Sequence, residues 1–427
     1  MTSVMPHILM TLRRSLACLV ALLPLAAPSF ASGCNCDRPG TGPEPGIEVL
    51  LHERAGELHG KRIGLVTNMT GVDRELRSDI DLLAARKDFR LVALYGPEHG
   101  VRGDVQAGGH VDSSRDTATG LPVYSLYGKT REPTVEMLDG VDVLLFDIQD
   151  VGARYYTYPY TLANVLRAAK KRGIPVWVLD RPNPLGGEKV EGPVLDPEFS
   201  SFVGMFPIPV RHGMTIGELA TLFNDEFGIG AELAVVKMRG WHRGDAEPGG
   251  TMPWVPPSPN MPTRDTALVY PGTALIEGTN VSEGRGTTRP FETIGAPFVD
   301  ARQLAARLNA LGLPGVRFRP TWFTPSFSKH KDVPCGGVQL HVFDRDAFQP
   351  FRTGVALVKT LHDLYPRDFR FQSGLPGASP DFFDKLAGNA WLKQAIERGD
   401  PLDAIEARWQ PALEAFRRQR RRHLLYP

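Results

Sequence analysis

The stretch Val141-Asp142-Val143-Leu144-Leu145-Phe146 is almost continuously apolar, and a polar run that starts at Asp147 follows it directly. Such segments are typical of strands that are buried on both faces of a parallel sheet. Further strands of this kind are predicted at residues 62–67, 89–94 and 175–179, with helices between them at 78–87 (N-cap Ser78) and 160–172. This alternation predicts an α/β fold, in which residues 47–225 form a Rossmann-like parallel sheet domain.

The remainder of the chain mixes helical and strand patterns without an internal repeat. Helices are predicted at residues 216–227, 301–311, 355–364 and 402–417, and strands at residues 233–238 and 338–343. This mixture predicts a smaller C-terminal α+β domain over residues 226–427.

The composition excludes several classes of protein. Of the 427 residues, 42% are hydrophobic and 23% are charged, which is ordinary for a globular chain and not for a disordered, coiled-coil or polytopic membrane protein. Lys and Arg total 49 against 48 for Asp and Glu, so the net charge is +1. No whole-chain electrostatic argument therefore exists for nucleic acid or an anionic membrane as a partner.

The N-terminal segment has the features of a secretory signal peptide over residues 1–31. Arg13 and Arg14 precede an apolar run, and Ser29-Phe30-Ala31 ends that run with small residues. The run is too short for an ordinary membrane span. We expect export to the periplasm or the extracellular space, a linker at residues 32–46, and no transmembrane segment in the mature chain.

Cysteine usage adds one alternative to free secretion. Ala31-Ser32-Gly33-Cys34 is similar to a weak bacterial lipoprotein box, in which Cys34 would be lipidated, although the usual leading Leu is absent. Cys34, Cys36 and Cys335 are too few for a disulfide framework in a chain of this size. Because the leading Leu of a lipoprotein box is absent, we rank soluble export ahead of the anchor.

Polar residues follow each predicted strand, and ligands of open parallel sheets bind beyond the carboxyl ends of the strands. The candidates are Asn68 after the first strand, Glu98 and His99 after the second, Asp147, Gln149, Asp150, Arg154 and Tyr155 after the third, and Asp180, Arg181 and Asn183 after the fourth. Loops are polar in general, which accounts well for Asn68 and for Asp180 as a structural acid. It accounts less well for Glu98 in Gly96-Pro97-Glu98-His99-Gly100, because small and rigid neighbours let a ligand approach the backbone closely.

Several common motifs are absent. No Gly-x-Ser-x-Gly elbow of a serine hydrolase occurs, and Gly128-Lys129-Thr130 lacks the leading glycine of a P-loop because position 123 is Val. Gly284-x-Gly286 is followed by Arg289 where a dinucleotide fingerprint needs glycine. We expect no nucleotide and no other cofactor.

A metal site is the less favoured interpretation of one glycine-rich stretch. Glu98, His99, Asp104, His110 and Asp112 lie close together in the sequence. None has the i, i+4 histidine spacing of helical zinc sites, and the intervening glycines indicate a loop. We therefore expect no metal and interpret the stretch as a flap over a cleft.

A second polar stretch covers residues 270–292 and includes Asn280, Glu283 and Arg285. It combines three acids, two arginines and several hydroxyl groups, with little to bury. A solvated connector between domains is the plain alternative, whereas polar sets of this kind with aromatic faces alongside bind sugars. Tyr155, Tyr156, Tyr158, Trp254 and Trp322 are candidates for those faces.

Several separate segments carry a family resemblance. They are residues 96–100, 147–158, 179–184, Pro257-Ser258-Pro259-Asn260-Met261-Pro262, residues 277–287, and Lys329-His330 before Cys335-Gly336-Gly337. With these segments in this order, residues 46–427 resemble the NamZ-type exo-β-N-acetylmuramidases. The resemblance implies a Rossmann-like domain, a smaller C-terminal domain and a site in the cleft between them. It also implies release of N-acetylmuramic acid from the non-reducing ends of peptidoglycan fragments.

Glycoside hydrolysis generally needs two carboxyl groups, one to protonate the leaving oxygen and one to activate water or attack the sugar. We expect Glu98 to be the general acid or base, with His99 orienting it. For the second carboxyl group the candidates are Glu283, Asp150 and Asp147, in that order.

Muramic acid carries a lactyl carboxylate, which a guanidinium group matches with two hydrogen bonds. Arg154, Arg181 and Arg285 are the candidates for that contact. Further substrate contacts are expected from Asn68, Gln149, Tyr155, Asp180, Asn183, Asn260 and Asn280.

Two other functions remain open at this point. A non-catalytic protein that binds cell-wall fragments would use the same polar strand ends without needing an acid. A metal-dependent amidase built on Glu98, His99 and His110 is the weaker alternative.

Overall fold

The computed structural model describes residues 42–102, 114–245, 250, 252–372 and 379–427. The predicted signal peptide, most of the linker, Cys34, Cys36, Asp104, His110 and Asp112 lie outside the described residues.

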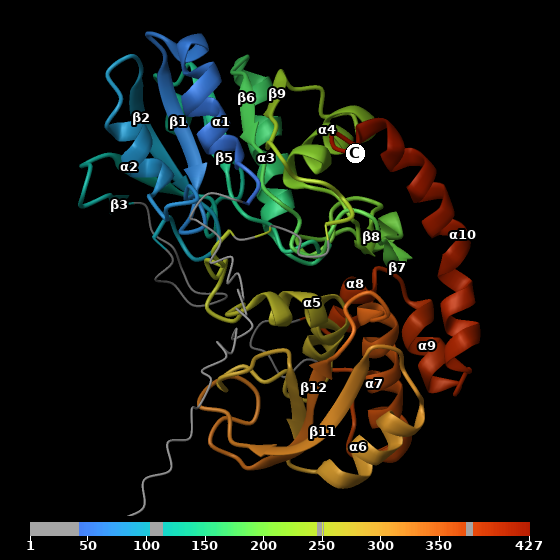
Figure 1. Ribbon diagram of the computed structural model, residues 1–427. Coiled ribbons are helices and arrows are strands. Elements are labelled where there is room, and N and C mark those ends of the chain that lie inside the picture. The colour runs from blue at the N-terminus through green and yellow to red at the C-terminus, as the bar shows by residue number, and fades with distance from the viewer. Residues whose placement is uncertain (1–41, 103–113, 246–249, 251, 373–378) are drawn as a thin grey trace, which may run out of the picture. The chain divides into compact units, whose positions relative to one another are not determined.

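The first half of the chain contains a seven-stranded sheet, whose strands lie side by side in Figure 1. Its members are β1 (Arg62–Thr67), β2 (Arg90–Gly96), β3 (Ser114–Arg115), β4 (Pro122–Ser125), β5 (Val143–Asp147), β6 (Val176–Leu179) and β9 (Leu233–Val236). The order is β3-β4-β2-β1-β5-β6-β9, and all pairs are parallel except β3 with β4. The parallel strands therefore have the Rossmann order. Successive strands are added on one side of β1 up to β4 and on its other side from β5 onward, so the switch point lies between β1 and β5.

Helices cover both faces of this sheet, as the uninterrupted apolar strands predict. They are α1 (Gly46–Val49), α2 (Asp79–Ala84), α3 (Tyr158–Arg172) and α4 (Ile216–Glu226). Leu145 of β5 packs into a cluster with Ile47 next to β6 and with Ile80 of α2. Its neighbours Leu144 and Phe146 face the other cluster, which contains the apolar side chains of α3 and α4. The predicted α/β class is confirmed.

Local signals place the elements well. Ser78 caps α2 by accepting a hydrogen bond from the backbone N–H of Ile80, as predicted. The sheet, however, continues past residue 225, because β9 pairs with β6 from Val176↔Leu233 to Leu179↔Val236. The described residues from 42 to 427 belong to one compact unit, and the predicted domain boundary at residues 225/226 stays a prediction.

The second half contains a three-stranded antiparallel sheet of order β10-β12-β11, with α6 and α7 beside it (Figure 1). Its strands are β10 (Thr293–Ala296), β11 (Val316–Phe323) and β12 (Cys335–Val342), and its helices are α5 (Arg264–Thr273), α6 (Ala301–Ala310), α7 (Pro350–Leu364), α8 (Phe382–Ala387), α9 (Trp391–Glu397) and α10 (Leu402–Arg420). The hairpin β7 (Glu191–Val194) and β8 (Pro209–Arg211) packs against α10. Short helical turns complete the chain at Leu50–Arg54, Ala55–Leu58, Glu136–Leu138, Pro197–Phe199, Ala274–Gly278 and Arg421–His423.

None of the described helices is both long enough and apolar enough to cross a membrane.

Cys335 is a buried free thiol, and burial raises its pKa to about 11.

Candidate active site

A cavity of about 400 Å³ lies beyond the carboxyl ends of β2, β4 and β5. Its wall combines carboxyl, guanidinium, imidazole and amide groups with several aromatic rings. The lining residues are Glu98, His99, Tyr127, Arg131, Tyr155, Tyr156, Thr157, Tyr158, Phe202, Val203, Ser258, Asn260, Met261, Tyr270, Glu277, Arg285, Phe291, Phe382 and Leu386. A wall with both polar groups and ring faces suits a small polar ligand with an apolar face.

A tight turn after β2 carries Glu98 and His99 to the cavity. The backbone N–H of Gly100 donates to the carbonyl oxygen of Pro97 at 3.0 Å and closes the turn. His99 has φ 76°, a left-handed conformation that usually belongs to glycine, and it is 4% exposed. Such strain in a non-glycine residue is concentrated at functional sites, where surrounding contacts maintain it.

Two hydroxyl groups from different elements hold the Glu98 carboxylate. The Oγ1 atom of Thr157, just before α3, donates to Oε2 of Glu98 at 3.1 Å. Tyr127, which follows β4, hydrogen-bonds to Glu98 as well, and burial together with the Glu98 charge and this hydrogen bond raises the pKa of Tyr127 to about 12. Glu98 is half-buried, and these contacts orient its carboxylate in the wall of the cavity.

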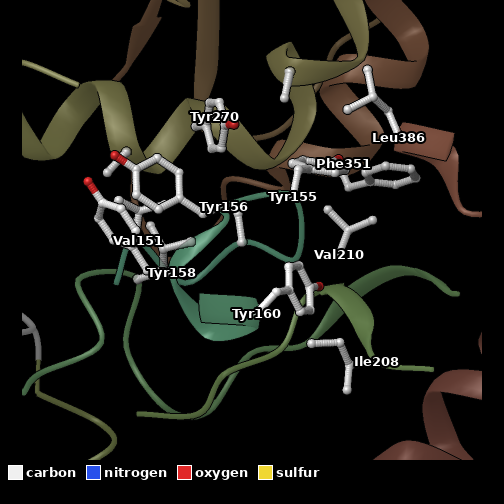
Figure 2. Packing of buried hydrophobic residues seen from close by; sticks show 14 of the residues in the cluster. Val151, Tyr155, Tyr156, Tyr158, Tyr160, Ile208, Val210, Tyr270, Phe351 and Leu386 are labelled. Atoms are coloured by element: carbon white, nitrogen blue, oxygen red, sulfur yellow. The ribbon is translucent and has the colours of Figure 1, made fainter. Parts of the chain in front are cut away.

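Tyrosines from both halves of the chain lie close together in Figure 2, and four of them, Tyr155, Tyr156, Tyr158 and Tyr270, line the cavity. Tyr156 lies edge-on to Tyr158, at 4.9 Å between ring centroids, and to Tyr270 of α5, at 6.0 Å. The hydroxyl of Tyr155 donates to the carbonyl oxygen of Pro271 at 2.6 Å. The loop after β5 is thereby fastened to α5, and the two together enclose one side of the cavity.

The polar stretch 270–292 is mostly buried, so the expectation of little to bury is wrong. Lys329 explains how this polar chain can be buried. Its Nζ atom donates to the carbonyl oxygens of Ile276, Thr279 and Val281 at 2.8–2.9 Å and lies 3.0 Å from Oε2 of Glu283. The ammonium group thus supplies the hydrogen bonds that water would otherwise give to these backbone carbonyl oxygens.

Glu283, the first choice for a second carboxyl group, is 0% exposed and does not line the cavity. Burial raises its pKa, but the charges of Lys329 and Arg285 outweigh burial and hold the pKa below its ordinary value. Its neighbour Glu277 does line the cavity and accepts a hydrogen bond from Arg285 at 2.7 Å. Burial raises the pKa of Glu277, and the charge of Glu283 adds to that effect.

Five of the predicted site residues meet at the cavity: Glu98, His99, Tyr155, Asn260 and Arg285. The others lie outside its lining, namely Asn68, Asp147, Gln149, Asp150, Arg154, Asp180, Arg181, Asn183, Asn280 and Glu283. Of the aromatic candidates, Tyr156 and Tyr158 also line it, whereas Trp254 and Trp322 do not.

Arg181 and Asp147 form a buried ion pair under the sheet edge. Nε and Nη2 of Arg181 contact the two carboxylate oxygens of Asp147 at 2.5 and 2.8 Å. Asp79 lies beside them, and burial together with the Asp147 charge raises its pKa well above the ordinary range. These charges balance one another inside the protein, so the expectation that Asp147 and Arg181 meet substrate is corrected.

Arg154 is fully buried, and the hydrogen bonds that it donates to described residues all go to backbone carbonyl oxygens. Its Nη1 atom reaches Pro193 and Ile208, and its Nη2 atom reaches Leu386 and Ala387, at 2.7–3.0 Å. Burial lowers the pKa of this guanidinium. Its role is to join distant segments, so the expected contact with a lactyl carboxylate is also corrected.

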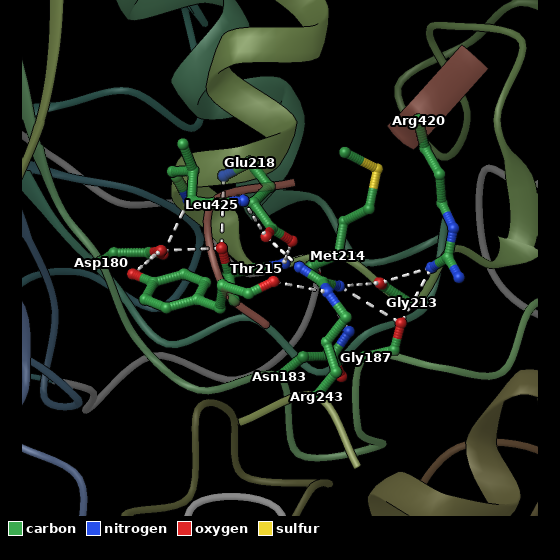
Figure 3. Close-up of polar contacts among 12 residues, drawn as sticks. Asp180, Asn183, Gly187, Gly213, Met214, Thr215, Glu218, Arg243, Arg420 and Leu425 are labelled. Carbon is green, nitrogen blue, oxygen red and sulfur yellow. Dashed lines mark hydrogen bonds and ion pairs between the residues drawn. The ribbon is translucent and has the colours of Figure 1, made fainter. Parts of the chain in front are cut away.

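Asp180 belongs to a polar network that Figure 3 shows around Glu218 and Arg243. Its carboxylate accepts hydrogen bonds from the Thr215 hydroxyl, the Gly217 N–H and the Tyr426 hydroxyl. Burial raises the pKa of Asp180 to about 6. This carboxyl group is structural, as the plain interpretation of strand-end polarity had allowed.

The remaining predicted residues make contacts within their own loops or to nearby backbone. Asn68 accepts from Thr70, Gln149 donates to carbonyl oxygens of Asp150 and Pro182, Asp150 accepts from the Gly152 N–H, Asn183 donates to the Met214 carbonyl oxygen, and Asn280 donates to that of Asp368. Short polar side chains after strands often brace turns in this way.

The sequence did not single out Tyr127, Arg131 or Glu277 as site residues. Tyr127 and Arg131 follow β4, a four-residue strand that begins with Pro122 and gives little periodic signal. Glu277 stands among three acids of one segment, and nothing in their spacing tells which one faces a cavity. Two signals were available for Glu277: it stands in the same polar stretch as Arg285, and it begins the segment 277–287 that carries the family resemblance.

A metal centre finds no support in the part of the chain that the structure describes. There, no three His, Cys, Asp or Glu side chains are grouped so that they could hold an ion. Two members of the proposed amidase set, Glu98 and His99, lie at the cavity, and the third, His110, is outside the described residues.

Fold and site together define a class: an α/β protein with a Rossmann-ordered sheet and, among the described residues, two carboxyl groups in an aromatic-lined cavity at the carboxyl edge of that sheet. Residues 63–265 match the family described as exo-β-N-acetylmuramidase NamZ, N-terminal, and residues 268–426 match its C-terminal counterpart. The chain belongs to the exo-β-N-acetylmuramidase NamZ family, as the resemblance predicted.

Individual relatives agree with this assignment. The chain is 53% identical over 414 residues to the peptidoglycan β-N-acetylmuramidase NamZ of Bacillus subtilis. This alignment covers 96% of this chain and 99% of that protein. Two crystal structures of DUF1343 family proteins from Bacteroides fragilis are similar, with TM-scores of 0.80 and 0.73 at 39% and 32% identity. Each comparison covers 90% of this chain and 99% of the other.

Proposed function

We propose that this protein is an exo-acting glycoside hydrolase that releases N-acetylmuramic acid from the non-reducing ends of peptidoglycan fragments. Family membership over both halves of the chain supports this activity. Among the features of the cavity, the one that carries the proposal is the Glu98 carboxylate, which lines the cavity and which Thr157 and Tyr127 orient.

The chemistry needs two carboxyl groups on the wall of one site. We assign Glu98 as the general acid or base, as the sequence predicted, and Glu277 in place of Glu283 as the second carboxyl group. Glu277 lines the cavity, whereas Glu283 is buried outside the lining and forms an ion pair with Lys329. The ring faces of Tyr156 and Tyr158 would pack against the sugar, which has an apolar face of its own.

Replacement of the carboxyl groups tests this assignment. Glu98→Gln and Glu277→Gln should each lower kcat/KM for a para-nitrophenyl β-N-acetylmuramide by about 100- to 10,000-fold, because a positioned acid or base contributes that much. Thermal unfolding of Glu98→Gln should match the parent protein, since Glu98 is half-buried and faces the cavity.

Glu132→Gln is a matched control. Glu132 follows the same strand as Tyr127, but it pairs with Lys171 and lies outside the cavity lining. Its turnover should be normal. Near-normal turnover in Glu98→Gln would remove that residue from the mechanism, and tight binding of muramyl fragments without any product in the parent protein would favour the non-catalytic alternative.

We further propose that the protein is exported by its N-terminal segment, with soluble release ahead of lipidation at Cys34. The order of charged, apolar and small residues before position 32 supports this. Mass spectrometry of the mature chain from the native host tests it: an N-terminus at Ser32 supports soluble export, and a diacylated Cys34 supports the anchor.

A further inference from the structure

Among the described residues, two arginines line the cavity, and Arg285 is the one that is paired with acidic side chains. Arg285 contacts Glu277 at 2.7 Å and Glu283 at 3.2 Å, so its charge is already balanced. For Arg131, no carboxylate of the described residues lies within ion-pair distance, and the residue is exposed. Of the arginines in the described cavity wall, Arg131 is therefore the one that can accept a new anion.

Aromatic side chains hold the Arg131 guanidinium in place. Its Cζ atom lies 4.0 Å from the ring centroid of Phe202 and 6.0 Å from that of Tyr127, and both rings also line the cavity. A guanidinium that stacks on a ring keeps its edge N–H groups free, and these N–H groups match the two oxygens of a carboxylate. Stacking also restricts the long side chain before a ligand arrives, which reduces the entropy lost on binding.

The same cluster connects Arg131 to the proposed catalytic group. Tyr127 hydrogen-bonds to Glu98 and stands 6.1 Å from Phe202, ring centroid to ring centroid. Arg131 thus belongs to the wall that carries Glu98, and a single sugar at Glu98 would present its substituents to this wall.

We propose that Arg131 binds the lactyl carboxylate of the terminal N-acetylmuramic acid residue and thereby selects that sugar over N-acetylglucosamine. This inference rests on the proposed function. The two sugars differ only in the 3-O-lactyl group, so discrimination must come from a contact to that group. Arg131 takes the role that the sequence had assigned to Arg154, Arg181 or Arg285.

A cycle of two substrates and two proteins tests the contact. The substrates are the chromogenic N-acetylmuramide and the same compound with its lactyl carboxylate converted to a carboxamide. Arg131→Met retains a long apolar side chain against Phe202 but removes the charge. In the parent protein the carboxamide should lower kcat/KM by about 10- to 100-fold, mainly through KM, as expected for a charged hydrogen-bonded pair.

In Arg131→Met, kcat/KM for the acid substrate should fall by the same factor, and the carboxamide should be no worse than the acid. For the acid substrate, kcat/KM of Arg131→Lys should lie between the values of the parent protein and Arg131→Met, because lysine keeps the charge but lacks the planar guanidinium. Arg167→Met is the control. Arg167 lies 5.5 Å from the ring centroid of Phe206 but does not line the cavity, so this variant should prefer the acid over the carboxamide by the same factor as the parent protein.

The possible failures are distinguishable. If the parent protein releases muramic acid but Arg131→Met still prefers the acid substrate by the full factor, the assignment of Arg131 is wrong and the proposed function stands. An equal loss on both substrates would likewise overturn it, because that would show general damage to the cavity wall. If the parent protein cleaves neither substrate, the proposed function itself fails.

Discussion

At the scale of single residues, the turn after β2 shows how the chain accepts strain to present a functional group. Gly96 and Pro97 lead into it, and Gly100 takes φ 75°, which costs a glycine nothing. His99 takes φ 76°, which costs a side-chain-bearing residue of the order of 1 kcal/mol. The cost is consistent with a residue that is needed at the cavity for its imidazole rather than for its backbone.

Two substitutions at this position separate the backbone from the imidazole. His99→Gly should have a free energy of unfolding about 1 kcal/mol higher than His99→Ala, because only alanine retains the strain. Both should lose turnover to the same extent if the imidazole orients Glu98. Urea unfolding and kcat measurements check this. Full activity in the glycine variant, with loss in the alanine variant alone, would instead assign the role to the backbone.

At the scale of elements, buried charges fasten the ends of strands to the starts of helices. Asp180 at the end of β6 accepts hydrogen bonds from Thr215 and Gly217 at the start of α4. Figure 3 shows the same network extending through Glu218 and Arg243 toward Arg420 of the last helix. Because Asp180 is fully buried, its ionisation is linked to the stability of this junction.

The raised pKa of Asp180 predicts a specific pH dependence. Its pKa is about 6 in the folded protein, against the ordinary value of 3.8 that we take for the unfolded chain. The folded protein therefore binds this proton more tightly than the unfolded chain does. The stability it contributes is therefore complete below pH 3.8 and is lost as the pH rises through about 6, a difference of about 3 kcal/mol. Relative to Asp180→Asn, the parent protein should lose this amount between pH 4 and pH 7.

Urea unfolding of both proteins across that range measures the difference. The readout is the change with pH and not the absolute stability, because asparagine also alters the hydrogen bonds to Thr215 and Tyr426. Parallel stability curves for the two proteins would contradict the prediction.

At the scale of the whole compact unit, long-range contacts decide how the two halves of the chain share one cavity. Tyr155 bonds to the backbone at α5, and Arg154 bonds to the backbone of α8, more than 200 residues away. The loop after β5 therefore belongs structurally to both halves. This explains why its side chains complete a cavity that also includes Glu277 and Arg285.

Arg154 should accordingly behave as a structural residue. Arg154→Lys keeps the charge but cannot reach all four carbonyl oxygens, so the free energy of unfolding should fall by about 2–5 kcal/mol. At a temperature where the variant is folded, KM for the chromogenic muramide should be unchanged. Calorimetry and steady-state kinetics check this. An unaltered stability with a raised KM would restore Arg154 as a substrate contact.

Local patterns were sufficient for the elements and for one part of the site. The apolar run at residues 141–146 marked β5, Ser78 marked the start of α2, and the Gly-Pro setting of Glu98 marked the turn that lines the cavity. Each of these depends on residues within a few positions of one another, through side-chain periodicity, helix capping and turn geometry. Such short-range preferences can be read along the chain without a partner segment.

The choice among similar polar residues required the folded chain. Glu277 faces the cavity while Glu283 is enclosed with Lys329, and Arg131 is open while Arg154 is buried among carbonyl oxygens. The sequence presents both members of each pair as charged residues in loops. Whether such a group meets ligand or protein depends on which remote segment packs over it, and that contact joins positions too distant in the chain for any local pattern to show.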